Sequence, residues 1–358
     1  MINFIPVEYY STIFFYFMLL SVLLVWIKVN KSHKLIDSSP LAILLVWGLI
    51  FYMGLRPIHG VFVDMTTYAM SFERFTQGNY INMDRDVGFQ YFMLACSKLM
   101  TINMFFLTCA FIYVYSHYKA SINIFGNKWY YAFIILISTL TFWGAGSNGI
   151  RNGLAAAILL LALSYERKKI IAILLLLLAV SFHKSMLLPL GAYLLTFIHN
   201  KPKSYLAFWL LCIPLSLALG GVFEVFFGSI GFDDDRLSYL TEGNVNDDAF
   251  SSTGFRWDFL LYGATAVFSG WYFIIKKKFE DTFYFRLFNV YLIANGFWIL
   301  VIRANFSNRF AYLSWFMMGL VIIYPFLKGN FMPNQPKKMG LVILIYFMFT
   351  FLMNVLLV

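Results

Sequence analysis

The chain has 358 residues, of which 61% are hydrophobic and only 12% are charged, and its mean hydropathy is +0.74. A water-soluble domain of this length cannot bury so much apolar surface, so the composition excludes a soluble globular protein. The formal net charge of +10 is explained by basic loops that face anionic lipid, and no nucleic-acid partner is expected.

Apolar runs of about the length of a membrane-spanning helix recur along the whole chain. A helix needs about 20 residues to cross the hydrocarbon core of a bilayer, which is about 30 Å thick. The pattern therefore predicts an all-α, polytopic membrane protein that forms a single transmembrane domain over residues 1–358. Twelve membrane-spanning helices are predicted, near residues 9–27, 41–55, 102–118, 129–143, 151–165, 170–183, 185–198, 205–223, 257–275, 284–302, 309–327 and 339–358.

Lys and Arg fall on opposite sides of the membrane if these helices alternate in direction. Loops on one side hold almost every Lys, whereas almost every Arg lies on the other side, with most of the Asp and Glu residues. The positive-inside rule assigns the Lys side to the cytoplasm, so the Arg side faces outward. Two external segments, residues 56–100 and 224–256, are long enough to cover an active site.

Three of the external Arg residues lie at or just inside the ends of predicted helices: Arg151, Arg303 and Arg309. The planar guanidinium binds phosphate oxygens through two hydrogen bonds and keeps its charge, which is why phosphate sites favour Arg over Lys. These residues are candidates for binding an anionic ligand, and structural ion pairing is the alternative interpretation.

His183 ends an apolar helix on the same external side, directly before Lys184. Imidazole is the side chain most readily poised as a base near neutral pH, so His183 is a candidate general base. A helix-capping role is an equal alternative.

Metal ligands and disulfides are not expected. Asp84-Arg85-Asp86 has the Asp-x-Asp spacing of some divalent-metal sites, but the central Arg opposes a cation. The three cysteines are scattered among apolar residues and are interpreted as packing residues: Cys96, Cys109 and Cys212.

Short motifs follow one another along the predicted external side. In chain order they are Arg56-Pro57 with Asp64 and Tyr68, Asp86-Val87-Gly88-Phe89, Arg151, His183-Lys184-Ser185, Gly254-Phe255-Arg256-Trp257-Asp258-Phe259, and Asn308-Arg309-Phe310-Ala311-Tyr312. Their order and spacing, over most of the chain, resemble the EpsG family of Wzy-type polysaccharide polymerases. Asp86 departs from the pattern, which is expected to have Glu before the Gly-Phe pair.

The resemblance implies a glycosyltransferase of the bacterial inner membrane, with a GT-C-like helical bundle and an active site that faces the periplasm. A growing glycan would move from undecaprenyl diphosphate to the non-reducing end of a second lipid-linked repeat unit. No cofactor is implied. The implied partners are undecaprenyl-diphosphate-linked glycans, membrane lipids and a chain-length regulator protein.

The resemblance also suggests roles for individual residues. Basic residues would hold the donor diphosphate and stabilise the charge that develops on it: Arg151, Arg303 and Arg309, with Arg56 and Arg256. Lys184 and Tyr68 are further candidates for substrate binding. His183 would accept the proton of the acceptor hydroxyl, with Asp64 or Glu73 as second choices. Both an inverting course and a retaining course through a carboxylate stay open.

Other functions stay open as well. An O-antigen ligase shares the diphosphate leaving group and the external base. A flippase or transporter of lipid-linked oligosaccharides needs charged residues deep inside its spans, whereas most charges here lie at span ends. A membrane acyltransferase needs its His on the acyl-CoA side, which is the side opposite to His183.

Overall fold

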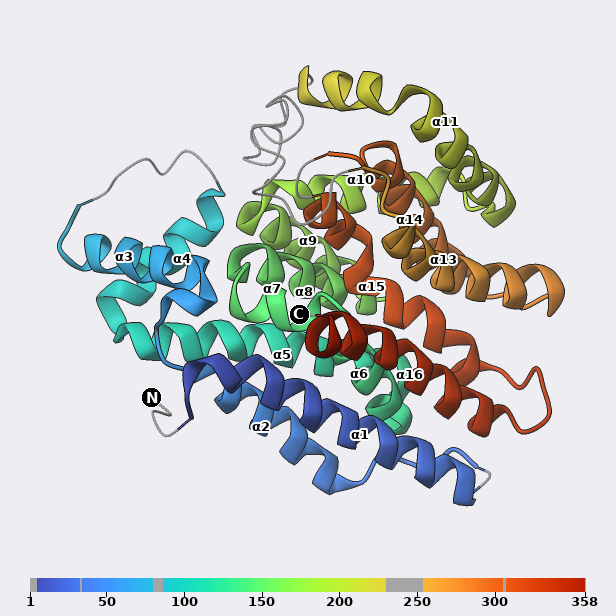
Figure 1. Cartoon of the computed structure of the whole chain (residues 1–358), viewed down its shortest axis with the longest axis horizontal. Coiled ribbons are helices and arrows are strands. Elements are labelled where there is room, and N and C mark those ends of the chain that lie inside the picture. The colour runs from blue at the N-terminus through green and yellow to red at the C-terminus, as the bar shows by residue number, and fades with distance from the viewer. Residues whose placement is uncertain (1–4, 33, 80–85, 230–253, 305–306, 358) are drawn as a thin grey trace. The chain divides into compact units, whose positions relative to one another are not determined.

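A backbone surrounded by lipid has to satisfy its own hydrogen bonds, and an apolar chain does so by forming helices. The computed structural model describes residues 5–32, 34–79, 86–229, 254–304 and 307–357, and within these ranges it is helical with no strand (Figure 1). The all-α prediction is thereby confirmed. Several helices start at a capping side chain, as α5 does at Thr101 and α14 does at Asp281.

The helices form two packed units. Unit 1 comprises the described residues up to His183 together with those from Phe326 onward. Its elements are η1 (Val7–Tyr9), α1 (Tyr10–Ser32), η2 (Pro40–Ala42), α2 (Ile43–Gly54), η3 (Gly60–Phe62), α3 (Asp64–Thr76), α4 (Val87–Leu99), α5 (Ile102–Phe125), η4 (Gly126–Lys128), α6 (Trp129–Ile137), α7 (Phe142–Ser147), α8 (Ile150–Ser164), α9 (Lys169–Phe182), α16 (Gln335–Phe351) and η8 (Leu352–Leu356).

Unit 2 covers Lys184–Pro325. Its elements are η5 (Lys184–Met186), α10 (Leu187–Ile198), α11 (Pro202–Ser229), α13 (Trp257–Trp271), η7 (Tyr272–Lys276), α14 (Thr282–Leu300) and most of α15 (Ser307–Lys328). A buried polar network joins three of these helices: the indole N–H of Trp209 donates to Asn295 (2.8 Å), and the amide of Asn295 donates to Ser314 (3.0 Å). Such bonds fix helix positions where hydrophobic packing alone is not directional.

The prediction of about twelve membrane-spanning helices is not supported. Within the described residues, six helices are long and apolar enough to cross a membrane: Val7–Ser32, Pro202–Phe223, Trp257–Lys276, Thr282–Leu300, Ser307–Lys328 and Gln335–Leu356. Four further apolar helices, Pro40–Gly54, Ile150–Ser164, Lys169–Phe182 and Lys184–Ile198, coincide with predicted spans but are shorter than 18 residues. At 1.5 Å per residue, a helix of about 15 residues reaches only about 22 Å.

The predicted span at residues 129–143 is also interrupted. The chain leaves helical geometry between α6 and α7, which frees backbone groups in the interior of unit 1. Thr350 of α16 satisfies one of them, because its hydroxyl donates to the backbone oxygen of Ser138 (2.9 Å). A buried backbone oxygen needs such a partner, and hydropathy does not show where the partner lies.

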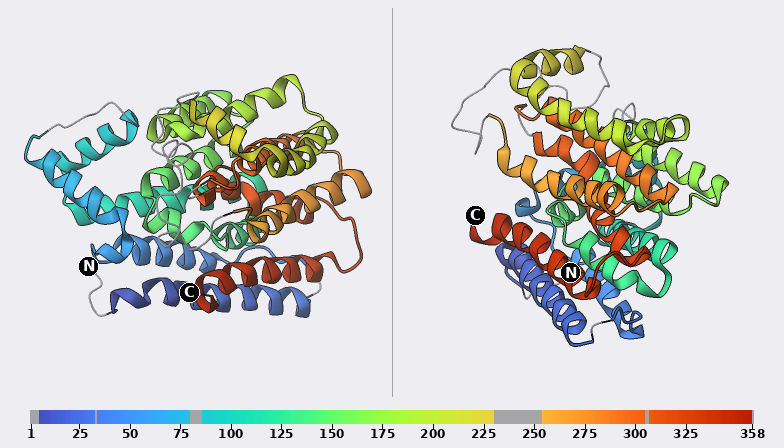
Figure 2. Two further views of the ribbon diagram at one scale, coloured as in Figure 1. Left: turned by 45° about the horizontal axis from the view of Figure 1, so that its top comes forward. Right: turned by 90° about the vertical axis from the view of Figure 1, so that its right-hand side faces the viewer.

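Helix α8 forms the core of unit 1, where it packs against α5 and α9. All of its residues are buried except Arg151, Leu161 and Ser164. Its small residues, with Ala at positions 155–157 and Gly153, allow neighbouring helices to approach closely. On another side of the unit, α1 lies beside α16, as Figure 2 shows. The single charged residue of α8 lies in its first turn.

Candidate active site at the Arg end of each helical unit

The two ends of unit 1 differ in the basic residue that predominates. Helices α8 and α9 form a hairpin, so Arg151 and His183 lie at one end while residues 165–169, which include Arg167, Lys168 and Lys169, lie at the other. The connections at residues 34–39 and 126–128 meet through a hydrogen bond from the backbone N–H of Ser38 to the backbone oxygen of Asn127 (2.7 Å). These connections contain Lys34 and Lys128. We call the end that carries these lysines the Lys end, and the end that carries Arg151 the Arg end.

The same division holds in unit 2. The amide of Asn200 donates to the backbone oxygen of Thr282 (3.3 Å), which joins the connections that contain Lys201 and Lys276–Lys278. The basic residues predicted to bind substrate lie at the other ends of these helices: Arg256 before α13, Arg303 after α14 and Arg309 in the first turn of α15. In each unit, the candidate site residues are therefore separated from the Lys-bearing connections by the length of a helix.

At the Arg end of unit 1, an asparagine brings the start of α3 to the start of α8. The side-chain oxygen of Asn148, which lies between α7 and α8, accepts a hydrogen bond from the backbone N–H of Asp64 (2.8 Å). Asp64 is the first residue of α3, where this N–H has no partner within the helix. Tyr68 lies one turn further along α3, on the same face as Asp64.

Tyr68 lies close to Arg151. Its hydroxyl is near the backbone of Arg151 and within electrostatic reach of the Arg151 and Asp64 charges. Burial raises the pKa of Tyr68 to about 12, and the Arg151 charge opposes this shift only in part. The phenol is therefore neutral and able to donate a hydrogen bond near pH 7. Its ring packs edge-on against Phe89 of α4, with 5.6 Å between the ring centroids.

Arg151 forms an ion pair with Asp86. The Nη1 of Arg151 lies 3.1 Å from the Oδ2 of Asp86, and the side chains are 27% and 8% exposed, respectively. Asp86 precedes α4 and has a left-handed backbone conformation with φ of 46°. Asp is one of the few non-glycine residues that adopts this conformation readily, which gives a physical reason for a short acid at this position. We call Asp64, Tyr68, Asp86, Asn148 and Arg151 the Arg151 cluster.

His183 lies at the end of α9, next to the segment that contributes Asp86. It is 6% exposed, and its backbone N–H donates to the backbone oxygen of Ala179 (3.1 Å). The start of α4 lies against the end of α9, because a Cβ added at Gly88 would lie 2.1 Å from the Oγ of Ser181. The structure therefore brings His183 to the same end of unit 1 as the Arg151 cluster.

Two predicted site residues of unit 1 lie outside the cluster. Glu73 is exposed on α3, nine residues after Asp64 and thus half a turn away on the opposite face. Arg56 is only 2% exposed, and its guanidinium donates to the backbone oxygens of Met53 and Ser147, the latter at 2.7 Å. Arg56 therefore joins the end of α2 to the end of α7, an arrangement that fits a structural role.

In unit 2, Arg256 is bound to its own neighbour. Its guanidinium donates two hydrogen bonds to the Asp258 carboxylate (3.0 and 2.6 Å) and lies 3.8 Å from the ring centroid of Phe259. This pairing offsets the Arg256 charge locally. An anion that binds there has to compete with the Asp258 carboxylate.

Arg303 and Arg309 are both exposed, and Lys184 is half-buried. Arg303 lies against α11, where Leu219 departs from helical geometry, and its Nη2 donates to the backbone oxygen of Leu217 (3.4 Å). The guanidinium also lies 6.0 Å from the ring centroid of Phe255. Of the Arg residues predicted to bind substrate in unit 2, these two retain the more accessible charges.

The remaining predictions concern metals, cysteines and the external cover. Among the described residues, no group of three or more His, Cys, Asp and Glu side chains could hold a metal ion. The three cysteines are buried and free. Asp84 and Arg85, and most of the predicted cover at residues 224–256, lie outside the described residues. Sequence reasoning missed Asn148 as the residue that joins α3 to α8, although the Ser147-Asn148 pair before a helix start is a capping signal.

A model of the EpsG family matches residues 41–358 of the chain. No curated protein and no solved structure matches the chain, and the GT-C-like arrangement stays a prediction. The matched region contains the whole Arg151 cluster, His183 and the Arg residues of unit 2. Since the match extends over most of the sequence, the chain belongs to the EpsG family.

Proposed function

We propose that this protein is a glycosyltransferase that polymerises lipid-linked repeat units into a polysaccharide at the periplasmic face of a bacterial inner membrane. Membership in the EpsG family supports a membrane protein of the polysaccharide-polymerase type. The main observation in support is the position of Arg151. This partly exposed cation lies in the first turn of a buried apolar helix. Undecaprenyl diphosphate is the proposed lipid, and a chain-length regulator is a proposed partner.

In the proposed reaction the diphosphate contacts the Arg151 guanidinium, which is 27% exposed, and competes there with the Asp86 carboxylate as an anion at Arg256 competes with Asp258. As the bond between the anomeric carbon and the diphosphate oxygen breaks, its electron pair passes to the diphosphate. A fixed guanidinium stabilises that charge, so the leaving group needs no protonation. The ion pair with Asp86 holds the Arg151 side chain in place, and the Tyr68 hydroxyl lies near the Arg151 backbone. Preorganisation of this kind avoids reorientation of the cation during the reaction.

The acceptor hydroxyl has to lose a proton as it forms the new glycosidic bond. His183 is the proposed base because imidazole accepts a proton near neutral pH and because α9 ends beside the start of α4. Asp64 is the second choice, since it lies in the Arg151 cluster. Glu73 lies on the opposite face of α3 and is the weakest of the three.

Two lipid diphosphates take part in each transfer, one on the donor and one on the acceptor. Arg303 and Arg309 of unit 2 are exposed and are proposed to bind a diphosphate, with Lys184 as a further cation. Arg256 is proposed to contribute only when Asp258 releases it. Arg56 is left out of this proposal because it is buried and its Nη1 and Nη2 already donate to backbone oxygens.

Deletion of the gene, followed by gel analysis of the surface polysaccharide, tests the function. Loss of a polymerase leaves single repeat units on the surface. Loss of a ligase leaves polymer on the lipid carrier, and loss of a flippase leaves neither product outside, and either result contradicts the proposal. Complementation with His183→Ala should restore protein in the membrane but not polymer. Polymer of normal length from this variant would contradict the assignment of His183 as the base.

A further inference from the structure

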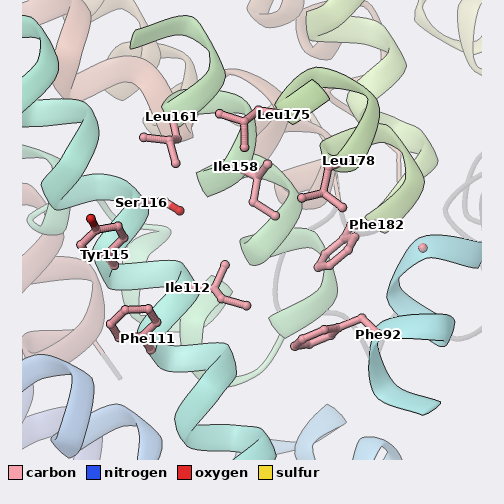
Figure 3. A pocket seen from close by; sticks show the side chains of 11 residues that line it. Phe92, Phe111, Ile112, Tyr115, Ser116, Ile158, Leu161, Leu175, Leu178 and Phe182 are labelled. Atoms are coloured by element: carbon pink, nitrogen blue, oxygen red, sulfur yellow. The ribbon is translucent and has the colours of Figure 1, made fainter. Parts of the chain in front are cut away.

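Unit 1 contains an apolar groove of about 430 Å³ between α4, α5, α8 and α9, shown in Figure 3. Each of these helices contributes to its walls. Representative lining residues are Gly88 and Phe92 of α4, Ile112 of α5, Ile158 of α8, and Leu178 and Phe182 of α9. Among the described residues that line it, the only polar side-chain groups are the hydroxyls of Tyr115 and Ser116. Such walls exclude a sugar or a diphosphate, which would lose hydrogen bonds to water there, and suit a hydrocarbon chain.

One end of the groove lies at the candidate active site. Gly88 is two residues from Asp86, the ion-pair partner of Arg151, and Phe182 directly precedes His183. From there the groove follows the helices toward the Lys end. Leu175 lies two helical turns from Phe182, roughly 10 Å away, and Leu161 lies roughly 15 Å along α8 from Arg151. The groove thus extends to about half the thickness of the hydrocarbon core.

The groove is open to the surroundings of unit 1. Leu178 is 41% exposed and Phe111 is 37% exposed, although both line it. Neighbouring positions on α9 outside the groove are more exposed still, at 61% for Leu177 and 62% for Leu174. A long hydrocarbon chain can therefore enter sideways from the bilayer and does not have to be threaded through a closed tunnel.

We propose that this groove binds the isoprenoid chain of a lipid-linked substrate whose diphosphate is held at Arg151. The inference rests on the proposed function, which requires a lipid diphosphate at the Arg151 cluster. A diphosphate in that position has to place its chain in the membrane next to α4 and α9, where the groove begins. The groove then fixes the direction of the chain, and binding of the chain positions the diphosphate for reaction.

A tail-labelled, photoreactive undecaprenyl diphosphate without sugar, added to the purified full-length protein, tests the proposal directly. Cross-links in the wild type should map to α5, α8 and α9 around the groove. Leu178→Trp places a large ring in the groove and should lower labelling by about tenfold, since at least two methylene groups lose their burial. Leu177→Trp makes the same change at an adjacent exposed position outside the groove and should leave labelling unchanged.

A second variant separates obstruction of the groove from misfolding. Leu161→Trp fills the far end of the groove, so it should weaken labelling by undecaprenyl diphosphate but not by a photoreactive geranyl diphosphate, whose short chain ends before that point. A misfolded variant would lose both. Equal labelling of Leu178→Trp and Leu177→Trp would overturn the proposal. Equal competition by phosphatidylglycerol and unlabelled undecaprenyl diphosphate would also overturn it, because the groove would then hold ordinary membrane lipid.

Labelling requires no sugar transfer, so its outcome is independent of the gel analysis that tests the polymerase function. A strain whose polysaccharide is unchanged by gene deletion contradicts the proposed function, whatever the labelling shows. A wild-type protein that polymerises but does not label in the groove contradicts the chain site alone.

Discussion

At the scale of single residues, the ion pair between Arg151 and Asp86 is central to the site. Asp86 is nearly buried, with 8% of its side chain exposed, and removal of Arg151 takes away the positive charge that this carboxylate pairs with. Breaking a buried pair from one side costs more than removing both partners. Stability and activity should therefore respond differently to single and double substitutions at these positions.

Arg151→Ala should lower polymerisation by about 100-fold or more, because a donor that stabilises developing charge is lost. It should also cost about 2–3 kcal/mol of stability, less than a fully buried pair because Arg151 is partly exposed. The double variant Arg151→Ala with Asp86→Ala should regain most of that stability but no activity. Thermal unfolding in detergent and polymer length in cells measure the two effects. Recovery of polymerisation by the double variant would rule out a role for Arg151 in binding substrate.

Arg151→Lys separates charge from geometry. Lysine keeps the positive charge but lacks the planar fork, so polymerisation should fall by about tenfold while the protein stays folded. Wild-type polymer from this variant would show that charge alone is sufficient and that diphosphate is not held through two hydrogen bonds.

Tyr68→Phe should lower polymerisation by about fivefold, since one polar group beside Arg151 is lost and such a group contributes about 1 kcal/mol. It also gives a pH signature. The folded-state pKa of Tyr68 is raised from 10.0 to about 12, so the stability it contributes is full below pH 10 and is lost as the pH rises through about 12. Between pH 10 and about pH 12, the free energy of unfolding should therefore fall less in Tyr68→Phe than in the wild type. Parallel thermal-unfolding curves for the two proteins over this range would contradict the burial of Tyr68.

At the scale of helices, close contact at a glycine holds the site together. A Cβ at Gly88 would lie 2.1 Å from the Oγ of Ser181 and 2.6 Å from its Cβ, so α4 and α9 would have to separate. The contact places the segment with Asp86 beside the end of α9. Hydropathy along α9 predicts an apolar helix there but does not show which neighbour approaches it.

Gly88→Ala should destabilise the protein by about 1–3 kcal/mol, the usual cost of overpacking, and should reduce polymerisation because Asp86 and Arg151 are displaced. Gly48→Ala in α2 is the matched control, because nothing lies within 4 Å of the added Cβ. The control should be neutral or slightly stabilising, since Ala favours helix more than Gly does. Unfolding midpoints and polymer length for the pair test this contact, and equal behaviour of the two variants would argue against it.

At the scale of the whole molecule, the separation of Lys and Arg predicts the orientation in the membrane. The positive-inside rule places the Lys end of each unit in the cytoplasm and the Arg end outside. The rule depends on the Lys and Arg residues in the loops next to the membrane-spanning helices and not on the exact number of these helices. The predicted orientation therefore does not depend on the count of twelve spans, which is not supported.

Cysteine labelling of intact cells checks that orientation. The native cysteines are buried and free, which keeps background labelling low. A membrane-impermeant maleimide should label Arg74→Cys, in the predicted external segment 56–100, and it should label Lys201→Cys only after the membrane is opened. Both positions are exposed, so accessibility within the protein is matched. The reverse pattern would place the Arg151 cluster in the cytoplasm and contradict a periplasmic polymerase.

The sequence by itself determined the helical membrane class, the separation of Lys from Arg and membership in the EpsG family, because hydropathy, charge position and motif order are local properties of the chain. The tertiary structure decided which motifs meet. It paired Asp86 with Arg151, placed Tyr68 near Arg151 and bound Asp64 to Asn148. It turned Glu73 away and placed two donors of Arg56 on backbone oxygens. It also shortened several predicted spans and formed the groove beside the site. These outcomes depend on close contacts between distant segments, such as Gly88 with Ser181, and no local pattern specifies such contacts.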